Sequence, residues 1–227
     1  MTGKGKRTAR RHPSAATLAS YAAGHLGQAA GIAVAAHLLH CEQCLATASM
    51  PEEAVGPTIP ELPLSPLAPD ALQRTMDRLH AAPTPPPDMV SAGALAGPTQ
   101  GAAITLDRLG LPVPKLRWAA PGVRVALLLQ ERWGSNDCET LFFLRVAPGV
   151  ALPSHGHQGS ELTCVLEGAF ADGTEQYNAG DMAEAEDDVS HRPVAEGLSD
   201  CVCLIATRGR LRFPGLIGRL AGAYLRI

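Results

Sequence analysis

The chain has 227 residues, 46% of them hydrophobic and 18% charged, which is enough apolar material for one large domain or two small ones. A net charge of −3 gives no electrostatic reason to expect a nucleic-acid partner, and an aromatic content of 4% argues against a platform that stacks single-stranded bases. The sequence has no run of about 18 uncharged apolar residues, so no transmembrane helix is expected. The basic N-terminal stretch is followed by no apolar run, which argues against a signal peptide.

The six cysteines do not form the pattern of a secreted disulfide framework. Two stand in a Cys-x-x-Cys motif with histidines close by, and two stand in Cys-Val-Cys on a predicted strand. Without a signal sequence, this usage favours metal or thiol chemistry in a reducing cytoplasm.

The first half of the chain is predicted to be helical. Residues 14–24 begin with a capping serine and end in glycine, and a second helix is predicted over about 26–50, ending before Pro51. A third helix is predicted over 69–82, where leucine and methionine side chains form one apolar stripe. The stretch 83–101 is rich in proline and glycine and has no period, so we expect a domain boundary there.

From about residue 120 the pattern changes to short strands separated by turn residues. Strands are predicted at 123–130, 139–147, 161–170 and 200–207. Such regular short strands are typical of a β-sandwich or a β-barrel. A last amphipathic segment over 214–227 is expected to cover an open face or to contact a neighbour.

The stretch HLLHCEQC, residues 37–44, holds four potential metal ligands. On one helix, with about 100° between residues, His37, Cys41 and Cys44 fall within a sector of about 60°, and including His40 widens the sector to about 100°. Zinc bonds of about 2.0–2.3 Å require the ligands to converge, so the first three are favoured and His40 is expected to face away.

A tetrahedral site needs a fourth ligand, and His12, His25 and His80 are the available imidazoles in this half of the chain. His25 lies in the turn after the first predicted helix. His12 precedes that helix, where an antiparallel pairing brings it towards the C-terminal half of the second helix. The hairpin therefore favours His12.

A second candidate metal site lies in the strand-rich half. Alternate side chains of a strand share a face, so His155 and His157 in PSHGHQGSELT point into one cavity, and Glu161 joins them after a short bend. His191 follows Gly180 by eleven residues and supplies the fourth ligand. Three histidines and one glutamate suit Zn, Fe, Mn or Ni.

Both segments resemble the two motifs of the cupin barrels. The first matches at each fixed position. The second has Glu186 and Asp188 in place of the usual proline and glycine, and Ala195 in place of its final asparagine. Cys201 and Cys203 are expected to face the same way, and buried inert thiols are favoured over a redox pair because same-strand neighbours seldom have good disulfide geometry.

The stretch HPSAATLASYAAG, followed by HLLHCEQC, resembles the zinc-binding anti-sigma domain of the ChrR-type anti-sigma factors. The resemblance implies that this domain is a small helical bundle that clamps an ECF-type sigma factor. It also implies a cupin-like C-terminal domain that binds a second zinc ion. The implied N-terminal zinc ligands are His12, His37, Cys41 and Cys44, and the implied cupin ligands are His155, His157, Glu161 and His191.

The resemblance implies an α+β chain of two domains, an N-terminal all-α zinc-binding bundle over 1–85 and a C-terminal cupin β-barrel over 106–227, joined by a linker over 86–105. The implied function is that of a cytoplasmic anti-sigma factor with no enzymatic activity and with neither nucleic acid nor membrane as a direct partner. Its sigma factor would be released on oxidative stress, such as singlet oxygen, sensed through the cupin domain. The alternative is a cupin metalloenzyme, either a dioxygenase or an isomerase, although no second acid–base pair is evident.

Overall fold

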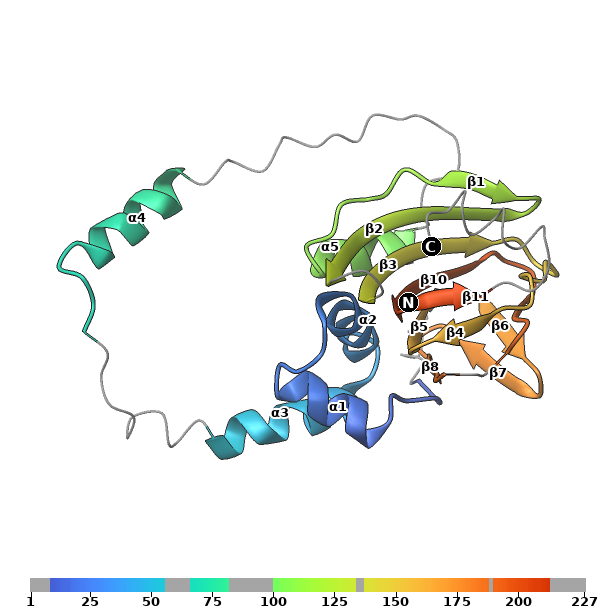
Figure 1. Ribbon diagram of the computed structural model, residues 1–227, viewed down its shortest axis with the longest axis horizontal. Coiled ribbons are helices and arrows are strands. Elements are labelled where there is room, and N and C mark those ends of the chain that lie inside the picture. The colour runs from blue at the N-terminus through green and yellow to red at the C-terminus, as the bar shows by residue number, and fades with distance from the viewer. Residues whose placement is uncertain (1–8, 56–65, 82–99, 134–136, 188–189, 213–227) are drawn as a thin grey trace, which may run out of the picture. The chain divides into compact units, whose positions relative to one another are not determined.

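The computed structural model describes residues 9–55, 66–81, 100–133, 137–187 and 190–212 (Figure 1). The chain divides into two compact units, Met1–Pro51 together with Ala96–Ile227, and Glu52–Leu95. The segment predicted over 214–227 lies outside the described residues, and the domain limits expected from the sequence stay a prediction.

The first helices follow the predicted order, with one correction. The helices of the described chain are α1 (Ala15–Ala22), α2 (Gln28–Leu38), α3 (Glu42–Val55), α4 (Ala71–Ala81) and α5 (Gln100–Arg108). The hydroxyl of Ser14 accepts a hydrogen bond from the Thr17 amide and caps α1, as the sequence predicts. The single helix predicted over 26–50 is wrong, because α2 ends at Leu38 and α3 begins at Glu42 and continues past Pro51.

Helix α4 confirms the helix predicted over 69–82. Its apolar residues Leu72, Met76 and Leu79 are 76%, 40% and 65% exposed, so the stripe is uncovered in this unit. None of the described helices is long and apolar enough to cross a membrane.

The second half of the chain is built from short strands. These are β1 (Arg117–Ala120), β2 (Val123–Trp133), β3 (Asp137–Val146), β4 (Gly156–Gln158), β5 (Glu161–Glu167), β6 (Ala169–Asp172), β7 (Glu175–Asn178), β8 (Met182–Ala185), β9 (Val194–Glu196), β10 (Cys201–Arg208) and β11 (Arg210–Arg212). They form a six-stranded sheet in the order β1-β2-β3-β10-β5-β8, a three-stranded sheet β7-β6-β9 and a pair β11-β4. The helical first part and the strand-rich second part confirm the predicted fold class.

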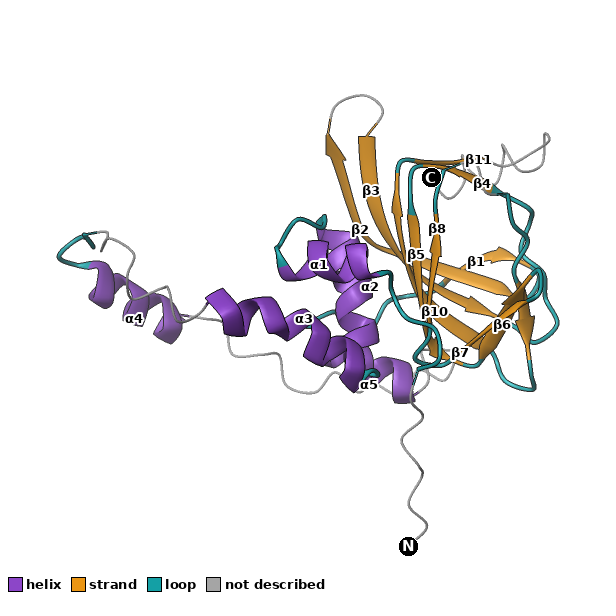
Figure 2. Ribbon diagram, turned by 90° about the horizontal axis from the view of Figure 1, so that it is seen from below, coloured by secondary structure: helices purple, strands orange, loops and turns teal. Residues whose placement is uncertain are grey.

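Both faces of the sheet are buried at its central strands, as strand β10 shows. Val202 and Leu204 face one core, which they share with α2 and α5. Cys201 and Cys203 face the opposite core, which lies inside the barrel. Helix α2 contacts β3, β5 and β10, so it lies on the outer face of the sheet (Figure 2).

A buried carboxylate fastens α2 to this face. Glu139 of β3 is 2% exposed, and its two carboxylate oxygens accept hydrogen bonds from the amides of Ala29 and Ala30, each at 3.1 Å. The first amides of a helix have no partner within the helix, and their partial positive charge favours an anion. A Cβ atom at Gly27 would lie 2.3 Å from the carboxylate, so this close approach requires glycine.

Candidate metal centres

The structure brings together the four residues predicted for the N-terminal centre. The potential ligand atoms of His12, His37, Cys41 and Cys44 all lie within 4.8 Å of one another. Nδ1 of His12 is 3.4 Å from Sγ of Cys41 and 3.3 Å from Sγ of Cys44. Zinc–nitrogen and zinc–sulfur bonds at a tetrahedral angle separate the two ligand atoms by about 3.6 Å, so the spacing fits such an ion.

The ring of His37 is fixed in the orientation that a metal ligand requires. Its Nδ1 donates a hydrogen bond to the carbonyl of Gly180 at 2.7 Å, which leaves the lone pair on Nε2. That Nε2 is buried and has no hydrogen-bond partner. Burial lowers the pKa of His37, although the bond to Gly180 acts in the opposite direction. The neutral imidazole that results is the form that binds metal ions.

The two thiols are buried as a pair, each residue 4% exposed. Burial, followed by the hydrogen bond and charge of Cys41, raises the pKa of the Cys44 thiol to about 12. Two thiolates side by side would repel each other, and a divalent cation reverses this preference because it binds the deprotonated forms. The donor set therefore fits a structural zinc ion of the Cys₂His₂ type.

The other three candidate histidines lie outside this cluster. His25 is exposed after α1, and His80 is exposed on α4. His40 faces away from the cluster, as predicted, but not into solvent: its Nε2 lies 3.2 Å from the Thr105 hydroxyl of α5 and the residue is half-buried. Because α2 ends before His40, the rotation expected on a continuous helix does not apply.

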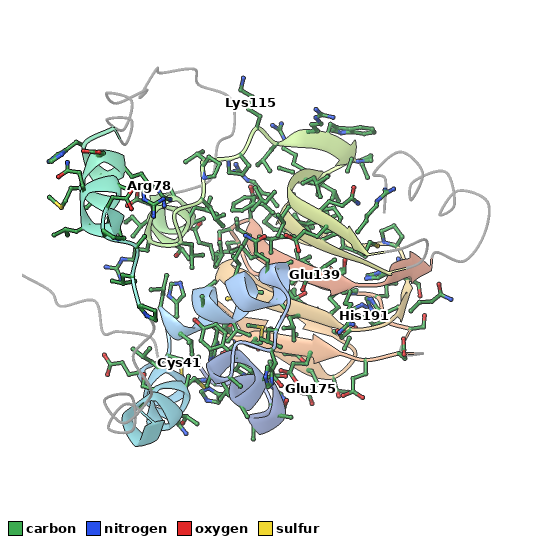
Figure 3. The ribbon with its side chains drawn as sticks, turned by 60° about the vertical axis from the view of Figure 1, so that its left-hand side comes forward. Cys41, Arg78, Lys115, Glu139, Glu175 and His191 are labelled. Atoms are coloured by element: carbon green, nitrogen blue, oxygen red, sulfur yellow. The ribbon has the colours of Figure 1, made fainter. Side chains whose placement is uncertain are left out.

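The cupin-type cluster is also assembled as predicted. Ligand atoms of His155, His157, Glu161 and His191 lie within 4.8 Å of one another. His155 and His191 are adjacent because their backbones exchange two hydrogen bonds, at 3.1 and 3.0 Å. Glu161 opens β5 and places Oε2 3.6 Å from Nδ1 of His157 and 4.0 Å from Nε2 of His155. In Figure 3, His191 lies among the barrel strands and Cys41 beside the N-terminal helices.

Hydrogen bonds at the outer edge of this cluster orient two of its rings. Nδ1 of His155 donates to the carbonyl of Pro153 at 2.9 Å, and Nδ1 of His191 donates to the carboxylate of Asp172 at 2.6 Å. The lone pairs of both Nε2 atoms therefore face each other at 3.0 Å. Lone pairs at this distance repel unless a cation lies between them, so the cluster fits a metal ion.

The third imidazole completes the same arrangement. Nε2 of His157 is 3.0 Å from Nε2 of His191, and its buried Nδ1 has no hydrogen-bond partner. Burial lowers the pKa of His157, Glu161 opposes that shift, and the neighbouring imidazoles reinforce it. The ring is held neutral, as a metal ligand must be.

The cluster opens into a mostly apolar cavity of about 190 Å³ inside the barrel. Cys201 and Cys203 also line this cavity, with their Sγ atoms 3.6 Å apart as free thiols. The hydrogen bond from Cys201, followed by burial, raises the pKa of the Cys203 thiol well above its ordinary value. The Cys203 thiol is therefore held in the protonated, less reactive form.

Three functional residues were not predicted from the sequence. Asp172 orients His191, Glu139 fastens α2, and Asp181 accepts amide hydrogen bonds from the segment before α1. Each acts on a residue distant in the sequence. The one local signal was the Gly180–Asp181 pair that opens the second cupin-type motif.

The comparisons with known proteins cover both centres. Residues 111–210 match the ChrR cupin-like domain. The anti-sigma-E factor ChrR of Cereibacter sphaeroides is 34% identical over 220 residues, which are 97% of this chain and 100% of that relative. The crystal structure of Rhodobacter sphaeroides SigE in complex with the anti-sigma ChrR matches with a TM-score of 0.65 and 35% identity, covering 88% of this chain and 100% of that one. The chain belongs to the ChrR family of anti-sigma factors.

Proposed function

We propose that this chain binds an ECF-type sigma factor and thereby keeps it from RNA polymerase. The observation that carries the proposal is the likeness to ChrR, which extends over nearly the whole chain and includes a solved chain in complex with SigE. Sigma factors act with RNA polymerase in the cytoplasm, so we place the protein there. The relatives' names describe a regulator and support this role over the metalloenzyme alternative.

The N-terminal centre is proposed to bind a structural zinc ion. His12 precedes α1, His37 lies near the end of α2, and Cys44 lies in the first turns of α3. One ion held by these residues would fasten three short segments that bury few large side chains of their own. Structural zinc ions commonly stabilise domains of this size in this way.

Helix α4 is proposed to contribute to the sigma-binding surface. Its leucine and methionine stripe is exposed, and an exposed apolar stripe at helical spacing is typical of a helix that docks on a partner. The surrounding polar residues keep the uncovered helix compatible with water. Docking of this face would bury Leu72, Met76 and Leu79.

The barrel is proposed to sense oxidative stress through a second zinc ion held by His155, His157, Glu161 and His191. Zinc is preferred over Fe, Mn or Ni because the family likeness extends over this domain. The cavity gives a small oxidant access to the ligands and to Cys201 and Cys203. Oxidation of a histidine or cysteine at this position would remove a ligand or a packed side chain and loosen the barrel.

Co-purification tests the proposed function. The full chain with an affinity tag is co-expressed with each ECF-type sigma factor of its own organism. Recovery of one of them in a stoichiometric complex supports the proposal, and a matched variant, Met76→Asp, should reduce that recovery by placing a charge in the α4 stripe. If none of the sigma factors co-purifies with the folded, zinc-loaded chain, the proposal is wrong.

A further inference from the structure

One buried carboxylate of the barrel holds the backbone beside a ligand of the N-terminal centre. Oδ1 of Asp181 accepts hydrogen bonds from the amides of Arg10 and Arg11, at 2.6 and 3.1 Å. In return, the carbonyl of Arg11 accepts a hydrogen bond from the amide of Met182 at 3.1 Å. His12 directly follows Arg11, so this candidate ligand is adjacent in sequence to the backbone that the barrel holds by hydrogen bonds.

The barrel also holds the chain on the other side of that ligand. The amide of Ser14 donates to Oε1 of Glu184 at 3.0 Å. His12 therefore lies between Arg11, whose amide is bonded to Asp181 just before β8, and Ser14, whose amide is bonded to Glu184 of β8. The imidazole of His12 is exposed, so these backbone bonds provide more restraint than packing does.

The same turn of the barrel orients a second ligand. Gly180, which precedes Asp181, accepts the hydrogen bond from Nδ1 of His37. The turn itself is rigid, because Gly180 and Asp181 each share a backbone hydrogen bond with Val165 of β5, at 2.8 and 3.0 Å. Oδ2 of Asp181 accepts a further bond from the amide of Asn178 at 2.8 Å.

We propose that Asp181 is a positioning residue for the N-terminal metal centre, through which the barrel controls how firmly that centre holds its ion and how reactive its thiols are. Asp181 is 1% exposed, and each hydrogen bond described for its carboxylate comes from a backbone amide. A buried carboxylate with such partners is costly to remove and hard to replace. The inference rests on the proposed binding of zinc at the N-terminal centre.

The route from the barrel's own metal cluster to this turn is short. Strand β8 pairs with β5, with Ala185 opposite Glu161 and Met182 opposite Cys164. One end of this pair of strands therefore carries a ligand of the cupin-type cluster, and the other end holds the backbone beside His12. A displacement of β8 would reach the N-terminal centre without passing through a loop.

The test measures the alkylation rates of individual cysteines in the full chain. Iodoacetamide labels the zinc-loaded protein, and peptide mass spectrometry follows Cys41 and Cys44, with Cys164 as the reporter of general opening because it is 0% exposed in the core beneath α2. In Asp181→Ala we expect Cys41 and Cys44 to react about 10–100-fold faster than in the parent, because loss of a group that orients a metal ligand lowers metal affinity by about that factor. The rate at Cys164 should rise far less, because this thiol stays buried even though its pKa loses the contribution of the Asp181 charge.

A second pair of variants leaves the barrel intact. Arg10→Pro removes one amide donor to Asp181, whereas Arg10→Ala keeps the amide and removes only the side chain. We expect faster alkylation of Cys41 and Cys44 in Arg10→Pro and the parent rate in Arg10→Ala.

A third variant changes Asp181 conservatively. Asp181→Asn keeps an oxygen for the Arg10 and Arg11 amides, so Cys41 and Cys44 should be alkylated more slowly than in Asp181→Ala.

The outcomes separate this inference from the proposed function. If removal of zinc does not speed alkylation of Cys41 and Cys44 in the parent, the N-terminal zinc site is wrong and the inference falls with it. If zinc protects the parent and protects Asp181→Ala and Arg10→Pro equally well, the zinc site stands and the positioning role is overturned. A rise at Cys164 equal to that at Cys41 would show general unfolding and would also overturn it.

Discussion

Nδ1 of His37 donates a hydrogen bond to the carbonyl of Gly180, so a predicted ligand of the helical part is oriented by a turn of the barrel. Gly180 has φ +95° and is buried, and a Cβ atom there would lie 3.3 Å from Cβ of His40. The position therefore favours glycine, for its backbone conformation and for the close approach of His40, which follows α2. The two candidate metal centres lie in one compact unit.

Replacement of Cys41 should remove the N-terminal zinc ion and abolish sigma inhibition. The Cys41→Ala variant loses one of four ligands, and a three-ligand site in a small domain binds zinc weakly. We expect the zinc content by atomic absorption to fall from about two ions per chain to about one. Cys138→Ala is the matched control, since Cys138 lies in neither cluster and should keep both ions. Full zinc content in Cys41→Ala would contradict the assignment.

Replacement of His155 should separate binding from release. His155→Ala removes a ligand of the barrel cluster and leaves each ligand of the N-terminal centre in place. We expect the variant to lose one zinc ion, to inhibit its sigma factor as the parent does, and to retain it under oxidative stress. A reporter gene driven by that sigma factor measures both properties. Loss of inhibition without stress would show that the proposed division of roles is wrong.

Replacement of Glu139 should destabilise the packing of α2 on the sheet. Glu139→Ala leaves the amides of Ala29 and Ala30 buried without an acceptor, which costs about 1–3 kcal/mol of unfolding free energy. Urea denaturation measures the change. Glu196→Ala removes a half-buried carboxylate that accepts from the Gln176 side chain at the surface, and it should cost less than Glu139→Ala. Equal losses in the two variants would argue against a specific role for Glu139.

The thiol of Cys164 should make stability fall at alkaline pH. Burial, followed by the charge of Asp181, raises the pKa of Cys164 to about 12 from 9.0. The unfolded chain releases this proton near pH 9 while the folded chain keeps it, so the unfolding free energy decreases as the pH rises from 9 to 12, by at most about 1.4 kcal/mol per pH unit. Urea denaturation should give a shallower decline for Cys164→Ala than for the parent. An equal decline of the unfolding free energy with pH in the parent and in Cys164→Ala would contradict the raised pKa of Cys164.

Local sequence patterns were sufficient to predict the two candidate metal-binding clusters. Period-2 strands place His155 and His157 on one face, and the spacing to Glu161 and His191 follows the cupin motifs, so the cluster could be found without the fold. His37, Cys41 and Cys44 were also predicted, although by rotation along a continuous helix that the structure does not contain, and His12 was predicted from an antiparallel pairing of helices. The agreement reflects the ligand types and their short spacing more than the helix arithmetic.

Tertiary contacts explain what the sequence could not predict. No glycine or proline marks the end of α2 at Leu38, and the break is accompanied by the contact of His40 with Thr105 of a distant helix. Helix α5 was not predicted, because the side chain that caps it is distant in the sequence. Glu167 of β5 accepts a hydrogen bond from the Ala102 amide at 2.7 Å. Local propensity contains no information about such partners.

Transcription by purified RNA polymerase tests whether the chain inhibits its sigma factor. The full zinc-loaded chain is mixed with the ECF-type sigma factor that co-purifies with it, and transcripts from a promoter of that sigma factor are counted as the chain is titrated. We expect transcription to fall to background at one chain per sigma factor, and we expect Cys41→Ala to fail to inhibit. Undiminished transcription in the presence of excess zinc-loaded chain would contradict the proposed inhibition.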